Sequence, residues 1–402
     1  MDIVCFASAD YEEPNWVNAQ HLMTRLASRH RVLYVNSLGL RAPRATGRDL
    51  RKIARRLRPG GLRRPDPSRE LFVLSPLALP PVRGAWAERL SAALLSARLS
   101  GSLARLGFSR PVAWAFLPTA APVVERLALG PVIYHCVDAY EANPGADRAI
   151  VRALEDRLLA RSRVVIASSA PLAVRFAGRH PRVLTLPNVA DLDAYPRPGS
   201  ALPEPRELAI LPRPRIVYLG NLAAFKVDLA LLAQAVRRRP GFAWVFIGDI
   251  GLGEAATPVA ELRGLPNVYL LGPQPRARLA EFLHHCDVAL IPFIENETTR
   301  HSFPMKFFEY LACGLPVVSA SLPSLREHLV EPFALAYEGL SAFLQAIDRA
   351  LAAGSPAAAA RRRELAEAHS WNRRMIEMEE LLAKLKAEDE AGRDQPAGAG
   401  RE

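Results

Sequence analysis

The stretch "TTRHSFPMKFFEYLACGLPVVSAS", residues 298–321, decides how the second half of the chain folds. Ser302 is a residue type that caps helices, and Pro304 is tolerated in a first helical turn because its missing N–H would have no partner there. Gly314 is typical of a helix end, and Pro316 begins an apolar run that predicts a strand. The stretch therefore predicts a helix that begins at Ser302, ends at Gly314 and leads into a buried strand.

Lys306 and Glu309 lie three residues apart, so they share one face of this predicted helix. A surface pair of this kind stabilises a helix by only ~0.3 kcal/mol. Alternatively, Lys306 and the N–H groups of the helix N-terminus bind an anionic phosphate, with Arg300 as a weaker further cation. Glu309 would then accept hydrogen bonds from ribose hydroxyls. The pattern alone leaves both interpretations open.

Apolar runs alternate with helical patterns on both sides of the segment 196–214, which contains six prolines. Prolines at this density predict a linker. Continuous apolar strands separated by helices predict parallel sheets covered on both faces. The sequence therefore predicts an α/β protein with two doubly wound, Rossmann-like domains facing across a cleft. Ligands of such sheets bind at the carboxyl ends of the strands, so the cleft is the expected site.

The alternation also sets the expected boundaries. They are a first domain over 1–195, a linker over 196–214, a second domain over 215–370, a C-terminal helix over 371–387 that packs back across both domains, and a disordered tail over 388–402. The expected strands are 3–9, 31–37, 71–76, 111–117, 131–137, 163–169 and 182–188 in the first domain, and 215–220, 242–248, 267–272, 287–292 and 316–321 in the second.

The composition is that of a globular protein, with half of the 402 residues apolar and 23% charged. Its four cysteines are scattered and none forms a C-x-x-C pair, so we expect reduced core thiols of a cytoplasmic protein. The first residues lack a basic leader and make a poor signal peptide. Because no apolar run reaches 18 residues, we expect no membrane-spanning helix.

The net charge of +11 comes largely from the segment 41–64, which has ten basic residues and a single acid, Asp49. Such a cluster attracts phosphates of anionic lipids, although a plain solvated loop fits equally well. Binding of nucleic acid is disfavoured, because the cluster contains no aromatic residue for base stacking and no known binding motif surrounds it.

The usual cofactor and metal motifs are absent. The nearest approach to a dinucleotide fingerprint is "GDIGLG" at 248–253, whose glycine spacing is wrong. The sequence contains no P-loop, no zinc-ligand cluster and no G-x-S-x-G nucleophile elbow. A nicotinamide enzyme is therefore disfavoured, and no metal site is predicted.

Several segments together resemble one enzyme family. "SFPMKFFEYLACGLPVV" (302–318) is similar to the donor-binding signature of GT-B glycosyltransferases. The supporting segments are "NAQHLMTRLA" (18–27), "YHCVDAY" (134–140), "LPNVADLDAY" (186–195), "YLGNLAAFKVDLALL" (218–232), "LPNVYLLGPQP" (265–275) and "CDVALIPF" (286–293). The chain resembles the members that build bacterial surface polysaccharides, of the teichuronic-acid-synthesis type. The resemblance extends from residue 1 to about 385 and is firmest over 215–320.

The resemblance implies a role for individual residues. Lys306 would bind the donor diphosphate and Glu309 the donor ribose. Lys226 matches a second phosphate-binding position, although a plain surface lysine is the alternative. The backbone at Gly220 and Asn221 would approach the donor, and Arg300 remains a weaker candidate.

Two departures from the family pattern bear on the mechanism. Many retaining members carry a second glutamate eight residues before the ribose-binding one, and this chain has His301 there. In the segment "YHCVDAY" the family's first and last acidic positions are His135 and Ala139, which leaves Asp138 as the carboxylate. Asp138 is the candidate base of an inverting reaction, or a loop-ordering aspartate. His21 is a further catalytic candidate, or a packed histidine.

The resemblance implies a metal-independent glycosyltransferase that uses a nucleotide sugar as substrate and needs no cofactor. The acceptor would be a glycan or a lipid-linked molecule, and the protein would be cytoplasmic and peripheral at the inner face of the membrane. Two alternatives stay open: a nucleotide-sugar epimerase on the same fold, and a catalytically silent nucleotide-sugar-binding protein.

Overall fold

The computed structural model describes residues 1–13, 16–39, 61–76, 85–251 and 257–394, and it divides into two compact units. The first unit consists of Met1–Ser168, Leu172–Leu186 and Met375–Glu402, and the second consists of Ser169–Pro171 and Pro187–Arg374. Each unit has its own hydrophobic core.

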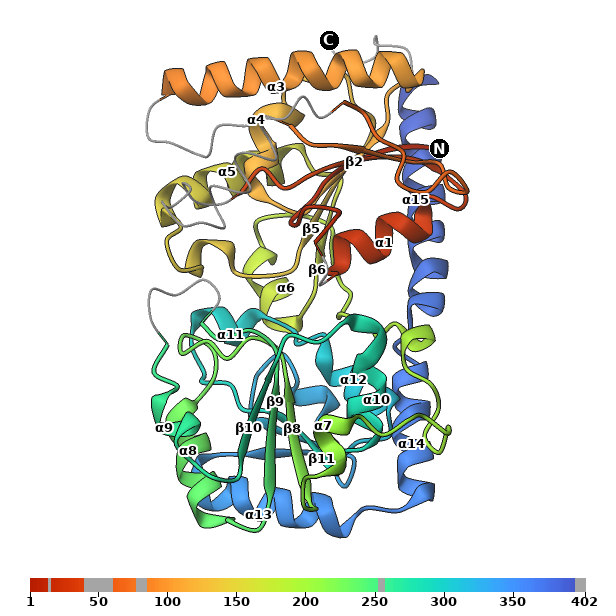
Figure 1. The fold of residues 1–402 in the computed structure, drawn as a ribbon. Helices are drawn as coiled ribbons and strands as arrows, with labels where there is room; N and C mark the ends of the chain where they lie inside the picture. The colour runs from red at the N-terminus through yellow and green to blue at the C-terminus, as the bar shows by residue number, and fades with distance from the viewer. Residues whose placement is uncertain (14–15, 40–60, 77–84, 252–256, 395–402) are drawn as a thin grey trace. The chain divides into compact units, whose positions relative to one another are not determined.

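The first unit is built on a seven-stranded sheet with the order β3-β2-β1-β4-β5-β6-β7, in which every pairing is parallel (Figure 1). Its strands are β1 (Asp2–Phe6), β2 (Arg31–Val35), β3 (Leu71–Leu74), β4 (Val112–Ala115), β5 (Val132–Cys136), β6 (Val164–Ala167) and β7 (Val183–Thr185). The helices between them are α1 (Asn18–Leu26), α3 (Ala85–Leu106), η1 (Pro118–Ala120), α4 (Ala121–Val124), η2 (Tyr140–Ala142), α5 (Arg148–Arg161) and α6 (Ala170–Phe176). Leu99 of α3, Val123 of α4 and Leu158 of α5 pack into its core.

The second unit is built on a six-stranded parallel sheet with the order β10-β9-β8-β11-β12-β13 (Figure 1). Its strands are β8 (Arg215–Leu219), β9 (Ala243–Ile247), β10 (Val268–Gly272), β11 (Val288–Ile291), β12 (Val317–Ala320) and β13 (Ala334–Tyr337). Its helices are η3 (Leu192–Ala194), α7 (Arg206–Ala209), α8 (Leu229–Arg238), α9 (Ala260–Arg263), η4 (Arg276–Arg278), α10 (Leu279–His284), α11 (Glu297–His301), α12 (Lys306–Ala312), η5 (Arg326–His328), α13 (Gly339–Ala352) and α14 (Pro356–Glu367).

The predicted α/β class with two doubly wound sheets is confirmed. Strands such as β6 and β11 are buried along their whole length, as their unbroken apolar sequences require. All seven expected strands of the first sheet form. In the second sheet the sequence pattern missed β13, a strand of only four residues that begins two residues after Pro332.

The predicted linker is wrong in one respect, because the proline-rich segment 196–214 belongs to the second unit and not to a free connection. Leu208 of α7 and Leu211 are buried in the core of that unit. The guanidinium of Arg215 donates to the carbonyl of Leu211 at 3.1 Å and pairs with Glu204 at 2.5 Å. The apolar residues between the prolines therefore anchor this segment, and the unit begins at Pro187 and not at 215.

The C-terminal region also differs from its prediction. The C-terminal helix expected over 371–387 forms as α15 (Trp371–Asp394), which is separated from α14 and continues into the expected tail. Ion pairs between residues four apart, Lys386 with Glu390 and Asp389 with Arg393, support the extra turns. The disorder predicted for 388–394 is therefore wrong, and 395–402 lie outside the described residues.

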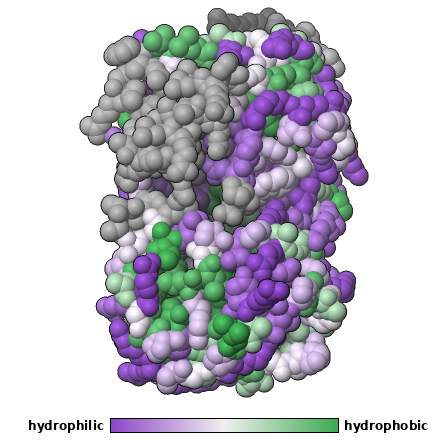
Figure 2. All heavy atoms as spheres, in the orientation of Figure 1, coloured by the Kyte–Doolittle hydropathy of each residue, from purple (hydrophilic) through white to green (hydrophobic). Residues whose placement is uncertain are grey.

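Two further features concern the molecular surface and the length of the helices. In the space-filling view, hydrophilic and apolar side chains are interspersed over the visible surface (Figure 2). None of the helices in the described parts of the chain is long and apolar enough to cross a membrane.

Candidate functional site

The carboxyl edge of the second sheet is lined by glycine backbone. Gly220 and Gly248 directly follow β8 and β9, and both have strongly positive φ angles, 136° and 138°. The N–H of Gly220 donates to the carbonyl of Ile247 at 2.7 Å, so the two strand ends stay side by side. A Cβ on Gly248 would lie 2.3 Å from the carbonyl oxygen of Gly220. Side chains are therefore excluded at the sheet edge where ligands of doubly wound folds bind.

The helix that carries Lys306 and Glu309 begins later than predicted. Residues 302–305 are not helical, and α12 begins at Lys306. The sequence pattern missed α11, whose N-cap Asn296 accepts hydrogen bonds from the N–H groups of Thr298 and Thr299. Ser302 ends this short helix and does not begin the next one. Lys306 and Glu309 are thus the first and fourth residues of α12, one turn apart.

The non-helical segment before Lys306 is fixed by its carbonyl groups. The carbonyl oxygens of residues 301–303 accept hydrogen bonds from the side chains of Ser169, Ser324 and Asn188, in that order, at 2.5, 2.8 and 2.6 Å. All three donor side chains are buried. They come from distant parts of the sequence, so local pattern could not identify them, and they set the position at which α12 starts.

Two lysines meet around one aromatic ring. The Nζ atom of Lys306 lies 4.1 Å from the ring centre of Tyr218 and 5.4 Å from that of Phe293. The Nζ atom of Lys226 lies 4.8 Å from the same Phe293 ring. Burial lowers the pKa of Lys306 well below its usual range, Lys226 lowers it further, and Glu309 acts in the opposite direction. An anion bound here would stabilise both ammonium groups.

Lys226 is positioned by the loop between β8 and α8. Its backbone carbonyl accepts from the N–H of Ile294 at 3.0 Å, and the next residue, Val227, forms an antiparallel bridge with Phe293. The side chain of Asn296 donates to the carbonyl of Phe225 at 2.6 Å. The loop after β8 is thereby joined to the loop after β11, which is why two lysines 80 residues apart meet.

Glu309 lies in a mixed electrostatic environment. Burial raises the pKa of its carboxyl, whereas the charges of Arg276 and Lys306 and a hydrogen bond from Tyr195 lower it. Asp191 raises it slightly, but this carboxylate is itself paired with Arg276 at 2.6 Å. Sequence reasoning identified Glu309 and Lys306 but missed the other three residues, which are distant in the chain.

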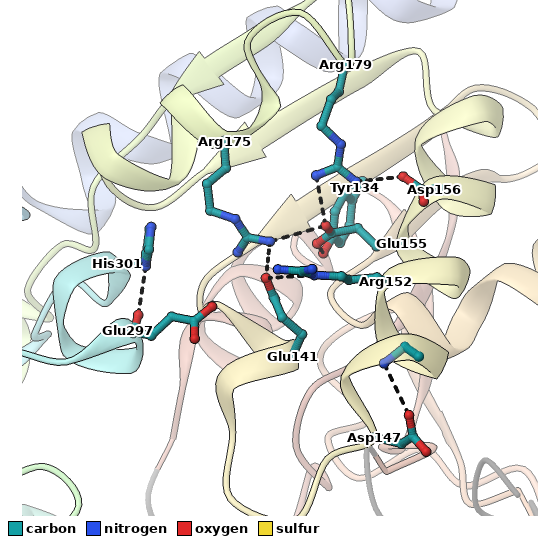
Figure 3. Close-up of polar contacts among 11 residues, drawn as sticks. Tyr134, Glu141, Asp147, Arg152, Glu155, Asp156, Arg175, Arg179, Glu297 and His301 are labelled. Atoms are coloured by element: carbon teal, nitrogen blue, oxygen red, sulfur yellow. Dashed lines mark hydrogen bonds and ion pairs between the residues drawn. The ribbon is translucent and has the colours of Figure 1, made fainter. Parts of the chain in front are cut away.

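The other residues that the sequence predicted to bind the donor lie in different surroundings. The backbone carbonyl of Asn221 accepts a hydrogen bond from the hydroxyl of Tyr218 at 3.0 Å. The backbone of Asn221 therefore lies beside the Tyr218 ring that Lys306 contacts. Arg300 is exposed and forms an ion pair with Glu295 at 2.8 Å. His301 contacts the carbonyl of Glu297 through Nδ1 at 2.7 Å, which completes a local helical turn (Figure 3).

The two catalytic candidates lie in the first unit. Asp138 follows β5 and is partly buried, and its carbonyl accepts from the thiol of Cys136 at 3.2 Å. It therefore stands at the carboxyl edge of the first sheet. His21 is buried within α1, where Nδ1 contacts Arg25 at 3.1 Å and the ring packs edge-on against Trp16. Its surroundings are those of a packed histidine.

His135, which lies in the same segment as Asp138, is a core residue. The ring of His135 stacks on Phe116 with centroids 4.8 Å apart, and its Nδ1 accepts from the indole of Trp114 at 3.3 Å. The family's acidic position is therefore occupied by an aromatic packing group.

A buried ion network, which sequence reasoning missed, lies next to β5 (Figure 3). Arg175 contacts Glu141 at 2.5 Å and Glu155 at 3.5 Å, and Arg179 contacts Glu155 at 3.2 Å. The hydroxyl of Tyr134 donates to Glu155 at 2.9 Å. The charges compensate one another, which permits two carboxylates to be almost fully buried.

All four cysteines are buried and free, as predicted. Among the residues that the structure describes, no group of three or more His, Cys, Asp or Glu side chains is placed to hold a metal ion.

The two parallel sheets give the chain a fold of the GT-B class. Sucrose-phosphate synthase from Thermosynechococcus elongatus superposes with a TM-score of 0.71 at 16% identity, over 96% of this chain and 99% of that one. HepE from Anabaena, solved with UDP-glucose, superposes with a TM-score of 0.66 at 16% identity, over 96% of this chain and all of that one. Likeness at this identity establishes the fold.

Within this fold, residues 213–353 match the family model described as glycosyl transferases group 1. The chain is 26% identical over 261 residues to TuaH of Bacillus subtilis (strain 168), whose name assigns it to teichuronic acid biosynthesis as a glycosyltransferase. It is 29% identical over 179 residues to a D-inositol 3-phosphate glycosyltransferase of Segniliparus rotundus. The matched stretches cover 64% and 38% of the lengths of these two relatives.

Proposed function

We propose that this protein is a glycosyltransferase that moves a sugar from a nucleotide-sugar donor to an acceptor hydroxyl. One observation carries the proposal: Lys226 and Lys306 converge on Phe293, and Glu309 lies one helical turn from Lys306 at the carboxyl edge of the second sheet. Two cations and a carboxylate at one sheet edge suit the phosphates and the ribose of a nucleoside diphosphate, which supports the proposal. The group 1 domain and the UDP-glucose bound by HepE support the same assignment.

In the proposed reaction the two lysines stabilise the leaving group. When the bond between the sugar C1 and the diphosphate oxygen breaks, its electron pair passes to that oxygen, and negative charge accumulates on the diphosphate. Preorganised cations at this position lower the barrier, because their charge is already in place. We propose that the lysines meet this need without a metal ion or another cofactor. Because residue 220 is a glycine, the Lys306 ammonium can lie directly beside the end of β8, where we propose that the phosphates bind.

We assign the base to Asp138 and not to His21. In an inverting transfer the acceptor oxygen attacks C1 while its proton passes to a carboxylate. Asp138 is partly exposed at the edge of the first sheet, whereas His21 is 2% exposed and contacts Arg25. Because His301 stands where many retaining members have a second glutamate, we propose that the transfer inverts the configuration at C1.

For the acceptor we propose a glycan or lipid-linked molecule of cell-surface polysaccharide synthesis, used by a cytoplasmic protein at the inner face of the membrane. The name of TuaH and the basic segment 41–64 support this. Residues 41–60 of the segment lie outside the described residues. Arg63 and Arg64 pair with Glu12 and Glu70, so any attraction to anionic lipid depends on the preceding arginines. Flotation with anionic vesicles at low salt tests it, and no binding would refute it.

The central experiment measures nucleoside diphosphate release from a panel of nucleotide sugars, with and without lipid-linked acceptors. Acceptor-dependent release is expected for a transferase, whereas an epimerase would convert the donor without release. The Lys306→Ala and Glu309→Ala variants should lose turnover. Turnover that survives in both variants would refute the site, and the anomeric configuration of the product, read by NMR, tests the inverting assignment.

A further inference from the structure

The helix α3 carries apolar side chains on two opposite faces. Leu95, Leu99 and Leu103 are buried and pack into the core of the first unit. Leu90 and Leu94 lie on the other side of the helix, and they are 49% and 61% exposed. A helix that is apolar all round is normally buried on every side. The outer face of α3 is therefore open to solvent although its composition is that of a covered face.

The two exposed leucines begin a continuous row along the helix. Its members follow one another at alternating spacings of four and three residues, so they share one side of α3. Every member is exposed, and together they form the outer row: Leu90, Leu94, Ala97, Gly101 and Ala104. The row extends over about 20 Å of helix, and α3 lies on the outer surface of the first unit (Figure 1).

Arginines border the outer row. By helical spacing Arg98 and Arg105 lie on one side of it and Arg89 on the other, and all three are exposed. The one acid in the sequence of α3 is Glu88, which is compensated by Arg157 at 2.7 Å. The row is therefore an apolar strip with positive borders.

This pattern of charge favours a lipid surface over a second copy of the chain. Amphipathic helices in the plane of a membrane insert their apolar face about 5–10 Å deep, while long basic side chains reach the headgroup phosphates. Two copies that met through the outer row would instead bring their arginine borders together, and like charges oppose such contacts. An anionic bilayer offers both an apolar interior and negative charges at the matching depth.

We propose that the outer row of α3 is a membrane-docking surface, which inserts Leu90 and Leu94 into the headgroup region of an anionic bilayer and places Arg89, Arg98 and Arg105 against lipid phosphates. This goes beyond the proposed function, because it involves no residue of the donor site. It also differs from the attraction proposed for the basic segment, because charge alone does not insert a side chain.

The experiment attaches an environment-sensitive fluorophore to Leu94→Cys and adds phosphatidylcholine vesicles with and without about 30% phosphatidylglycerol. The four native cysteines are buried, so the introduced thiol reacts selectively. We expect a blue shift of the emission with the anionic vesicles and none with the neutral ones. Ile376→Cys on α15 is the matched control, because it is also 61% exposed in the same unit. It lies about 20 Å along that helix from Asp389, whose partner Arg110 follows α3, so its probe should stay in water.

Sedimentation with the same vesicles measures how much the side chains contribute. The double variant Leu90→Gln with Leu94→Gln should bind anionic vesicles about tenfold more weakly, because two partly inserted leucines are lost. Its urea midpoint should stay at the wild-type value, since both positions are exposed. Arg105→Gln should weaken binding about fivefold through the loss of one charge at the lipid surface. Ile376→Gln should change neither binding nor stability.

Three results would overturn the proposal. If the protein sediments with anionic vesicles while the Leu94→Cys probe keeps its emission in water, the attraction comes from the basic segment 41–64 and not from α3. A blue shift that grows with protein concentration in the absence of vesicles would assign the outer row to contact between two copies. Wild-type protein that does not bind anionic vesicles at all also refutes it. The donor site is tested separately by nucleoside diphosphate release, so failure of one proposal leaves the other standing.

Discussion

Lys306 occupies the space that a side chain at Gly220 would need: a Cβ at Gly220 would lie 2.4 Å from the Nζ atom. The φ angle of Gly220 is 136°, so the backbone there is also one that other residues rarely adopt. The end of β8 and the start of α12 are therefore matched to each other. The lysine can approach the strand end only because residue 220 has no side chain.

Gly220→Ala should therefore impair both stability and donor binding. Backbone strain at such a φ angle costs about 1–3 kcal/mol, and the methyl group displaces the ammonium of Lys306 from its place over Tyr218. We expect a lower urea midpoint and weaker binding of a nucleoside diphosphate. Gly241→Ala is the control, because a Cβ there meets nothing within 4 Å. Unchanged affinity in a folded Gly220→Ala protein would contradict a phosphate site at this position.

Lys306→Met should raise the stability of the unliganded protein while removing its activity. The pKa of Lys306 is depressed in the folded state, whereas an unfolded lysine has a pKa of about 10.4. Between these two values the unfolded chain binds more protons, so wild-type stability rises with pH towards about 10.4 and is lost as pH falls through the folded pKa. The variant lacks this dependence. We expect it to be more stable than wild type at pH 7, because burial disfavours the charged ammonium of the folded wild type and methionine carries no charge.

Urea unfolding at several pH values measures this difference. The gap between Lys306→Met and wild type should narrow steadily as the pH approaches about 10.4. Lys386→Met, at a position that is 57% exposed, should give no comparable gain. A gap that stays constant over the whole pH range would mean that the gain comes from apolar packing of methionine and not from relief of a buried charge.

The sequence predicted those parts of the site that depend on local pattern. The apolar strands, Gly220, Lys306 and Glu309 all follow from spacing within one strand–helix unit or from the family signature. The proximity of Tyr195 and Arg276 to Glu309 could not be predicted, because these residues are 114 and 33 positions away from it in the sequence. Only tertiary packing brings such side chains together, and single-sequence periodicity does not record it.

The error at the start of α12 has a similar origin. Ser302 is a good helix cap in isolation, but Asn296 is a good cap as well, and its reciprocal hydrogen bonds with Thr299 start a helix earlier. The carbonyl contacts of residues 301–303 with distant side chains then keep the intervening segment out of a helix. Sequence reasoning considered only Ser302 as a cap, and the side chains that fix the segment after Asn296 come from distant parts of the chain.

Asn188→Ala should disturb the segment before Lys306. Asn188 is 6% exposed, and its side chain donates at 2.6 Å to the carbonyl of Phe303. Removal leaves that carbonyl without this donor, which should cost about 1–3 kcal/mol in the free energy of unfolding. Because the segment sets the start of α12, we also expect a higher KM for the nucleotide sugar. If stability falls and the KM stays at the wild-type value, the segment does not control the donor site.

Asp138→Asn should separate chemistry from donor binding. The substitution keeps the size of the side chain but removes the carboxylate that would take the acceptor proton, and a positioned base contributes about 10²–10⁴-fold to the rate. We therefore expect kcat to fall by that order while the dissociation constant of the nucleoside diphosphate stays unchanged, because the donor residues lie in the other unit. Asp156→Asn, at a position that is 66% exposed in the same unit, is the control. If Asp138→Asn retains wild-type kcat in the presence of acceptor, Asp138 is not the base. A retaining transfer then becomes the better account, because it requires no carboxylate at this edge of the first sheet.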